Sequence, residues 1–264
     1  MKNKFALLCI AVLLAVSSCS FTTKKFDTEG SDKDKILIEL ITYVIDQGHY
    51  DKRKIDNGFS KKVYKEFIES LDPMKRHFTQ KDLKDFDEYK TKIDDQILEK
   101  DISFFNLVYN RYQERIDDTK QFYGSILNED FDLNSEDYIN TDYENLDFVK
   151  NTKALKERWK KQLQFSILSN YYSAFETQNA QAKESDTIEI KSTDELKKEA
   201  IDLTRESIDR YFSNSEDLRR EDWFNLYLNT VVSQFDPHTG YLAPRDKDRF
   251  DISMSGKLEG IGAR

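Results

Sequence analysis

"STDELKKEAIDLTRESIDRYF", residues 192–212, contains a helix start and a helical face in one stretch. Ser192 and Glu195 form a capping box, in which each side chain can accept a hydrogen bond from the other residue's backbone N–H. Apolar side chains then recur at helical spacing at Leu196, Ala200, Leu203, Ile208 and Tyr211. The stretch therefore predicts an amphipathic α-helix with one face turned toward a core.

The same apolar spacing recurs on both sides of this stretch. It runs through residues 37–45, 63–71, 83–116, 155–175 and 224–235. Within 83–116 we expect a bend between the two halves. Helix starts are predicted at Ser31, at Ser60 and at Thr79, which forms a second capping box with Asp82. Helix ends are predicted at Gly48 and at Asp72-Pro73, because a proline disfavours helix in the residue before it.

The remaining segments read as connections. Residues 128–145 are acidic and weakly periodic, and residues 179–191 are polar, so we expect a connection and a mobile segment there. Eight glycines and three prolines in 264 residues favour long helices over many strands and turns. We therefore predict an all-α fold, a multi-helix domain over residues 31–236 whose aromatic stripes form its core.

The first residues have the pattern of a secretory signal. Lys2 and Lys4 precede an apolar run at 5–16, which is too short to span a bilayer. The small residues before Cys19 resemble a bacterial lipobox, in which the cysteine is diacylated and becomes the mature N-terminus. The alternative is an ordinary signal peptide with an incidental cysteine. We expect a lipoprotein signal at 1–18, a lipid anchor on Cys19 and a tether at 19–30.

Composition and motifs weigh against several kinds of chemistry. The formal net charge is −9, which argues against a nucleic-acid partner. The only cysteines, Cys9 and Cys19, lie in the signal region, so the mature domain has neither disulfide nor thiol chemistry. The three histidines match no zinc motif, and no phosphate-binding loop or G-x-S-x-G pattern is present. We expect no metal, no cofactor and no catalytic residue.

"FDPHTGYLAPRDKDRF", residues 235–250, predicts a rigid structural joint after the last helix. Asp236 and Pro237 end the helix, and the following residues, His238 among them, turn at Gly240, because glycine tolerates a positive φ. Tyr241 and Leu242 are expected to anchor the joint on apolar surface. The alternative is a self-sufficient hydrolase with His238 as general base, which would need a positioned partner.

Two stretches resemble one known family. The C-terminal "FDPHTGYLAPRDKDRFDISMSGKLEGIGAR", residues 235–264, is similar to the segment that leads into the PDZ domain of bacterial tail-specific proteases, also called C-terminal processing peptidases. "SLDPMKRHFTQKDL", residues 70–83, resembles part of that family's N-terminal helical region. The resemblance covers residues 31–264, although 120–190 match only in helical character.

The resemblance implies an envelope serine endopeptidase that recognises the C-terminal tails of proteins. In the family, a PDZ domain follows the helical region, and the catalytic serine and lysine lie beyond it, so no catalytic residue carries over to this chain. Residues 237–250 would be the joint and 251–264 the extended start of a PDZ domain. Gly260, Ile261 and Gly262 would belong to the region that receives a peptide carboxylate.

The expected function is therefore that of the N-terminal helical module of a lipid-anchored protease facing the periplasm. It would support substrate recognition and PDZ placement, with the catalytic domain missing from this chain, which would be inactive alone. The expected partners are C-terminal tails and an envelope lipoprotein. The alternative is an autonomous helical lipoprotein that binds a protein partner without catalysis.

Overall fold

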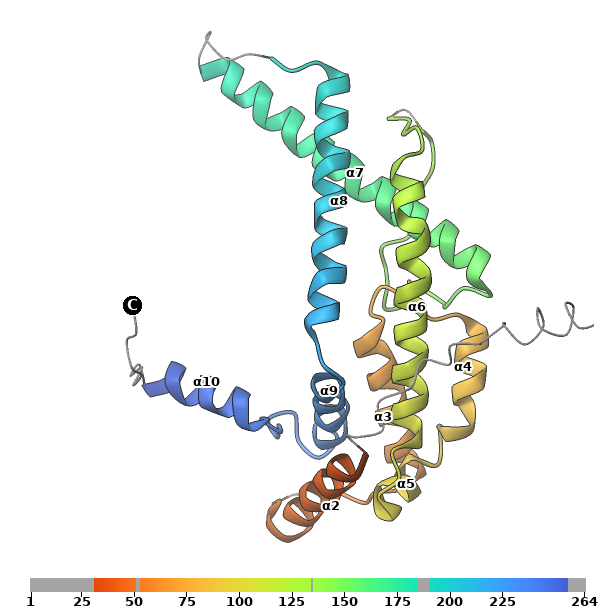
Figure 1. The fold of residues 1–264 in the computed structure, drawn as a ribbon, viewed down its shortest axis with the longest axis vertical. Coiled ribbons are helices and arrows are strands. Elements are labelled where there is room, and N and C mark those ends of the chain that lie inside the picture. The colour runs from red at the N-terminus through yellow and green to blue at the C-terminus, as the bar shows by residue number, and fades with distance from the viewer. Residues whose placement is uncertain (1–30, 51–52, 134, 185–189, 256–264) are drawn as a thin grey trace, which may run out of the picture.

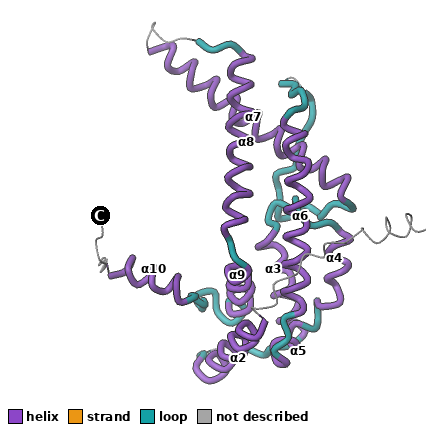
Figure 2. Tube along the Cα trace, in the orientation of Figure 1, coloured by secondary structure: helices purple, strands orange, loops and turns teal. Residues whose placement is uncertain are grey.

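A computed structural model describes residues 31–50, 53–133, 135–184 and 190–255. In these residues it contains nine α-helices, one 3-10 turn at Asp87–Tyr89 and no strand (Figures 1 and 2). The helices are α2 Ser31–Gly48, α3 Asn57–Leu71, α4 Gln80–Phe86, α5 Ile93–Glu99, α6 Ser103–Leu127, α7 Thr152–Glu184, α8 Thr193–Asp217, α9 Arg220–Val232 and α10 Pro244–Ser255. The prediction of an all-α fold is confirmed.

The helices form a body, a long arm and a projecting C-terminal helix (Figure 1). In the body, α3 packs against α5 and α9, and α6 contacts α4 and α9. The arm consists of α7 and α8, which pack against each other and against α6. By contrast, α10 buries no residue and extends away from the body. None of the helices in the described ranges is long and apolar enough to cross a membrane.

Aromatic rings from three helices make the centre of the body. Phe67 of α3 lies with its ring centroid 5.1 Å from that of Tyr227 of α9, edge to face. Phe105 of α6 meets Phe224 of α9 in the same way at 5.0 Å. All four side chains are almost completely buried, and burial of such a side chain contributes roughly 1.5–3 kcal/mol. The aromatic stripes of α3, α6 and α9 are therefore core, as predicted, whereas Phe175 of the predicted 155–175 stripe is exposed.

Local signals located some helix ends and missed others. Both capping boxes, at Thr79 and Ser192, are present, and α3 ends before Pro73 at Leu71. The predicted cap at Ser60 is wrong, because Asp56 accepts hydrogen bonds from the N–H groups of the first turn one turn earlier. The Ser60 hydroxyl is buried inside α3 and donates to the carboxylate of Asp94 in α5.

The stretch 83–116 is broken twice rather than bent once. Helix α5 ends at Glu99, and the next residue, Lys100, caps it in a left-handed conformation with φ 60°. The next residue, Asp101, accepts hydrogen bonds from the backbone N–H and hydroxyl of Ser103 at 3.0 and 2.6 Å and so supports the start of α6. Three helices, α4, α5 and α6, therefore replace the expected bent one. At the second break, the hydrogen bonds of the Asp101 side chain compete with continuation of the helical backbone.

Two boundaries near connections also differ from the prediction. Residues 179–184 continue α7, so this part of the segment that was expected to be mobile is helical. At the C-terminus, residues 244–255 are helical, so 251–255 are not the extended segment that was expected. The carbonyl of Ala243 accepts hydrogen bonds from the N–H groups of Asp246 and Lys247, both at 2.8 Å, and starts α10. Residues 256–264 lie outside the described residues.

Candidate functional site: the joint after α9

Residues 233–243, called the joint loop below, connect α9 to α10. The predicted joint at 237–250 therefore combines the second half of this loop with the first half of α10. Asp236 closes a turn within the loop: its carboxylate accepts the His238 N–H at 2.6 Å, and its carbonyl accepts the Thr239 N–H at 3.0 Å. The Asp-Pro-His-Thr sequence is thus held by hydrogen bonds within the turn itself, one of them to the side chain of Asp236.

The segment that follows α2 holds the joint loop from one side. The Nε2 atom of His49 lies 3.1 Å from the Thr239 hydroxyl, and the Tyr50 hydroxyl donates to the Asp236 carboxylate. Arg53 donates from Nη1 to the carbonyl of Gln234 at 2.8 Å. These three residues are about 180–190 positions away in the sequence, so only the tertiary fold brings them to the loop.

The Asp236 carboxylate is ionised in this setting. The hydrogen bond from the Tyr50 hydroxyl and the N–H of His238 lower the pKa of Asp236 below its usual value. His238 itself is exposed, and its ring makes no hydrogen bond with any residue that the structure describes. A general base requires a positioned partner, so this geometry gives no support to the hydrolase alternative.

Asn229 of α9 holds the joint loop from the other side. Its Oδ1 accepts the Tyr241 N–H at 2.8 Å, and its Nδ2 donates to the Tyr241 carbonyl at 3.1 Å. One amide side chain thus satisfies both backbone groups of a loop residue. Gly240 does not adopt a positive φ, and a Cβ atom there would lie 3.7 Å from Asn229 Oδ1, an ordinary contact. The turn is therefore built by Asn229 and not by glycine's conformational freedom.

The two predicted anchors of the joint behave differently. Tyr241 is half-buried and packs against the core, whereas Leu242 is 50% exposed, so the expected anchoring through Leu242 is wrong. The chain turns away from the body after Tyr241, because Pro244 begins α10. Arg245 in the first turn of α10 pairs with Asp222 at 3.0 Å, and Asp222 also accepts the Arg219 N–H at the start of α9.

The family model of the tail specific protease N-terminal domain matches residues 41–245. This chain belongs to that family. A "Tail-specific protease" from Haemophilus influenzae (strain ATCC 51907 / DSM 11121 / KW20 / Rd) is 28% identical over 236 residues, which cover 88% of this chain and 31% of the relative. The chain thus spans less than a third of the length of that relative. The resemblance seen in the sequence is confirmed for the N-terminal region.

The match to the tail specific protease N-terminal domain ends in the first turn of α10. Residue 245 is the arginine that pairs with Asp222, and the match begins at residue 41 within α2, so the matched region contains the arm, the whole joint loop and the body except the first part of α2. The family domain and the clamped part of the structure therefore end at the same place.

Cys19 and the stretch Gly260, Ile261 and Gly262 lie outside the described residues. In the described part of the chain, no group of three or more His, Cys, Asp or Glu side chains is arranged to hold a metal ion.

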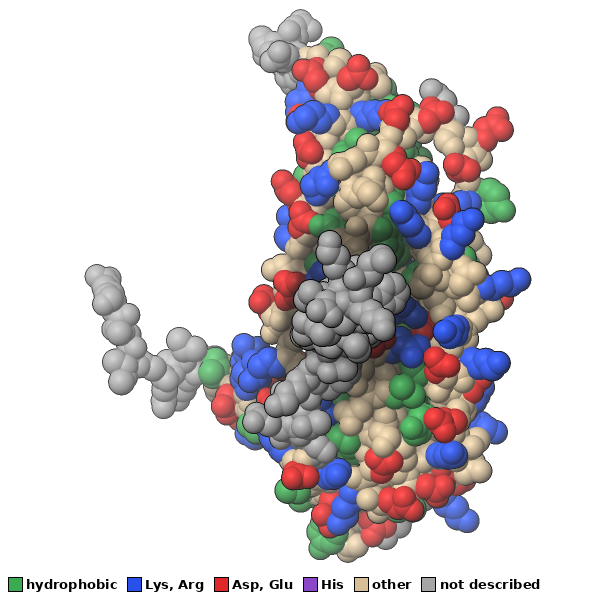
Figure 3. All heavy atoms as spheres, turned by 45° about the vertical axis from the view of Figure 1, so that its right-hand side comes forward, with side chains coloured by type: hydrophobic (Ala, Val, Ile, Leu, Met, Phe, Trp, Pro, Cys, Tyr) green, Lys and Arg blue, Asp and Glu red, His purple; other side chains and the backbone are tan. Residues whose placement is uncertain are grey.

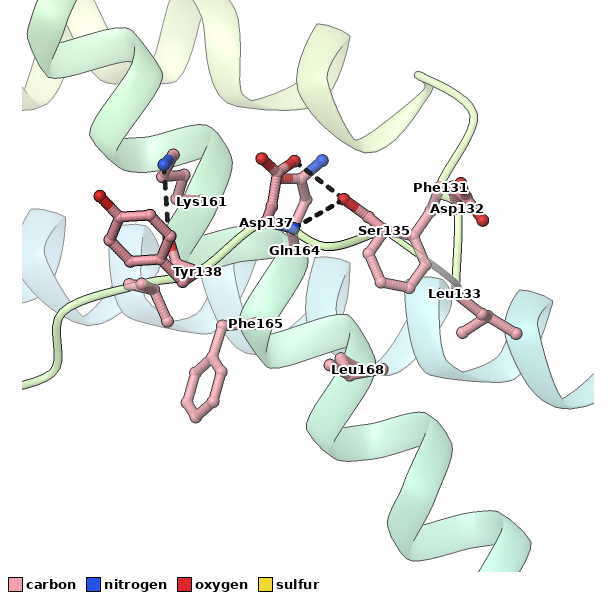
Figure 4. Close-up of a pocket in the computed structure, with 11 residues that line it drawn as sticks. Phe131, Asp132, Leu133, Ser135, Asp137, Tyr138, Lys161, Gln164, Phe165 and Leu168 are labelled. Carbon is pink, nitrogen blue, oxygen red and sulfur yellow. Dashed lines mark hydrogen bonds between the residues drawn. The ribbon is translucent and has the colours of Figure 1, made fainter.

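Sequence reasoning missed a groove along the arm. The connection after α6 passes beside α7, and together they line an open cavity of about 80 Å³ with apolar side chains that include Phe131, Phe165 and Leu168 (Figure 4). Lys161 of α7 donates to the Tyr138 carbonyl at 3.3 Å and holds the connection in place. No local signal marks this groove, because the connection is irregular and its apolar residues follow no period.

Proposed function

We propose that this chain is the N-terminal helical module of an envelope tail-specific serine protease, in which it supports substrate recognition and sets the position of a PDZ domain. The family match supports the first half of this proposal. The observation that carries the second half is the clamp on the joint loop. His49 and Tyr50 hold one side of the loop and Asn229 holds the other, while Arg245 ties the first turn of α10 to α9.

A clamped exit of this kind suits a positioning role. Each contact fixes a different part of the loop up to Tyr241, and the ion pair of Arg245 with Asp222 then biases the direction in which α10 leaves the body. An element that follows α10 would inherit this direction. The described helices contribute no nucleophile or base to the proposal, so peptide-bond cleavage is assigned to the Ser/Lys protease domain that the family places beyond the PDZ domain.

The partners follow from the same proposal. The protein is held at an envelope membrane by a diacylated Cys19, faces the periplasm, and acts on the C-terminal tails of proteins, with Gly260, Ile261 and Gly262 near the bound carboxylate and an envelope lipoprotein as a further partner. Acidic and basic side chains are interspersed on the face drawn in Figure 3. Such a mixed surface suits protein contacts rather than a phosphate backbone. No cofactor is part of the proposal.

The first test concerns the gene and the activity together. Reading the DNA beyond the codon for Arg264 in all three frames should reveal a PDZ-like sequence and a Ser/Lys protease domain. The longer product should cleave a peptide with an apolar C-terminal tail, whereas residues 20–264 alone should not. Cleavage by residues 20–264 that is abolished in His238→Ala would instead restore the hydrolase alternative.

The second test concerns the joint. In the longer product, Asn229→Ala should slow cleavage by roughly tenfold or more, because a misplaced recognition domain costs catalysis although it touches no reacting atom. Asn225→Ala, one turn earlier on α9, is the matched control and should cleave at the parent rate. Unchanged cleavage in Asn229→Ala, with the helical fold retained by circular dichroism, would contradict the positioning role.

One observation on α2 supports the alternative function, the binding of a protein partner. Four side chains of α2 form an exposed apolar stripe: Ile36, Leu40, Tyr43 and Val44 are 54–64% exposed. Such a stripe suits an autonomous helical lipoprotein that binds a protein partner without catalysis. A stop codon after Arg264 followed by an unrelated gene would favour this alternative over the protease module.

A further inference from the structure

An open cavity of about 410 Å³ lies on the arm, between α7, the turn after α3 and the 141–143 part of the connection. It adjoins the groove of Figure 4, since Phe165 lines both. Its wall is mainly apolar and includes Trp159, Leu163 and Ile208. Of the ten described side chains that line it, Arg76 alone is charged. The cavity thus combines an apolar wall with a single cation, a common composition of ligand sites.

Arg76 is held in place by aromatic rings rather than by an acid. Its guanidinium carbon lies 4.5 Å from the ring centroid of Trp159 and 4.7 Å from that of Tyr211. Stacking of this kind orients a guanidinium while leaving its N–H groups at the edge available. No carboxylate of the described residues forms an ion pair with Arg76.

The acid in the same turn is already fully engaged. Asp72 is buried, and its two carboxylate oxygens accept hydrogen bonds from the backbone N–H groups of Arg76, His77 and Phe78 at 2.7, 2.9 and 2.9 Å. Asp72 therefore shapes the turn that presents Arg76 but forms no ion pair with its guanidinium. The charge of Arg76 acts on Asp72 as one of the effects that oppose the rise in the pKa of that buried acid, but without an ion pair. An anion that enters the cavity would therefore form an ion pair that no described carboxylate provides.

A second group in the wall lacks a partner. Gln162 of α7 is 6% exposed, and its Nε2 donates to the Met74 carbonyl at 3.3 Å. Its Oε1 accepts no hydrogen bond from any described residue. Buried polar atoms are nearly always paired, because an unpaired one loses its water without compensation. A ligand with an N–H donor would supply the missing bond.

We propose that this cavity binds an N-acyl apolar amino acid unit. Its carboxylate pairs with the Arg76 guanidinium, its amide N–H donates to Gln162 Oε1, and its apolar side chain packs against Phe165 and Ile208, which line the same cavity. The same unit occurs as a free N-acyl amino acid and as the last residue of a peptide chain. The proposal does not rest on the proposed function above, since every group that it uses lies in the described helices and turns.

Calorimetric titration of the full chain tests the proposal directly. N-acetyl-leucine and a short peptide ending in leucine are the two probes, and N-acetyl-leucinamide, which lacks the carboxylate, is their matched control. Either acid should bind with saturation, and the amide should bind at least about tenfold more weakly. Absence of binding by both acids, or equal binding of acid and amide, would overturn the proposal.

Two variants locate the binding in this cavity. Arg76→Gln should weaken binding of the acid by about tenfold or more, whereas Arg76→Lys, which keeps the charge, should retain part of it. Gln162→Glu should also weaken binding, because a carboxylate replaces the acceptor amide and repels the ligand. Arg210→Gln, an exposed arginine beside Tyr211 on α8, is the control and should bind as the parent does.

A spectroscopic readout separates a binding defect from a folding defect. The chain contains two tryptophans, and Trp223→Phe leaves Trp159 in the cavity wall as the single reporter. The acid should shift the emission of Trp159, and the shift should saturate at the concentration found by calorimetry. Folded Arg76→Gln protein that binds the acid with the parent's affinity would show that the anion lies elsewhere and would refute the site.

Discussion

At the scale of single residues, Asp82 is the acid that both caps α4 and pairs with the arginines of α6. It is completely buried, and it closes the capping box with Thr79 while pairing with Arg111 and with Arg115, at 3.0 and 2.7 Å to the latter. Burial alone would raise the pKa of Asp82, but the hydrogen bonds from Arg115, Thr79 and Arg111 lower it to about 2. One carboxylate therefore joins α4 to α6.

Asp82→Asn should destabilise the protein by about 3 kcal/mol or more, because two largely buried arginines lose their shared buried counterion. The matched control is Asp85→Asn, whose side chain is 42% exposed and pairs with Arg111 at 3.1 Å. That change should cost less than about 1 kcal/mol. The free energy of unfolding in urea decides between them. Equal losses for both variants would show that the arginines, rather than the carboxylate, organise this contact.

At the scale of elements, α9, the joint loop and α10 behave as one unit with a firm and a loose part. Asn229 pairs with the backbone of Tyr241, and the ring of Tyr241 packs on the core. Beyond it, Leu242 is half-exposed and α10 buries nothing. The firm part ends at Tyr241, and the ion pair between Arg245 and Asp222 is the remaining link to the body.

Tyr241→Ala should therefore destabilise the protein by about 1–2 kcal/mol, since a partly buried ring is lost. Leu242→Ala should change stability by less than about 0.5 kcal/mol, because the side chain is already half in water. Denaturant midpoints compare the two, and hydrogen exchange should show α10 opening faster in Tyr241→Ala only. A larger loss from Leu242→Ala would mean that the loop packs in a different way.

At the scale of the whole molecule, His77 lies where the body meets the arm. Its ring faces Tyr112 of α6, Trp159 of α7 and Tyr211 of α8, with centroids 5.2, 5.8 and 6.0 Å away, and its Nε2 lies 2.7 Å from the Tyr211 hydroxyl. Burial, and after it the charge of Arg76, lowers the pKa of His77 to about 3. The ring is therefore neutral, and its protonation opposes the packing of three helices.

This setting predicts a pH dependence of global stability. The pKa of His77 in the folded state lies below its unfolded value of about 6.5. The stability that the buried neutral ring contributes is therefore complete above about pH 6.5 and is lost as the pH falls toward 3. Between about pH 7.5 and pH 5 the loss is about 2 kcal/mol. Urea unfolding of the parent and of His77→Gln at both pH values isolates this contribution, because the raised pKa of the buried Asp72 acts in both proteins.

The free-energy gap between parent and His77→Gln should shrink by about 2 kcal/mol at the lower pH. A gap of constant size would mean that the imidazole takes up a proton in the folded state without cost, as an exposed ring does. Tyr211→Phe serves as a second variant: it removes the hydroxyl beside Nε2 but leaves the ring buried, so the pH dependence should persist.

The fold class and several helix ends could be predicted from the sequence because their causes are local. A capping box joins residues three apart, as at Thr79 and Ser192, and a proline acts on the residue before it, as at Asp72. Apolar spacing likewise located the core faces of α3, α6 and α9. The motif at residues 235–245 predicted both the joint after α9 and the resemblance to the family. Such a motif is a short run of specific residues and can be recognised without the fold.

Only the tertiary structure decided how the joint is held and where the arm is hollowed. His49, Tyr50 and Arg53 reach the joint loop across about 180–190 residues, and Arg76 meets Trp159 and Tyr211 from separate segments of the chain. Ser60 shows the same limit, since its hydroxyl bonds Asp94 instead of capping a helix. Such contacts depend on how helices pack against one another, and side-chain packing between distant segments leaves no periodic trace in the sequence.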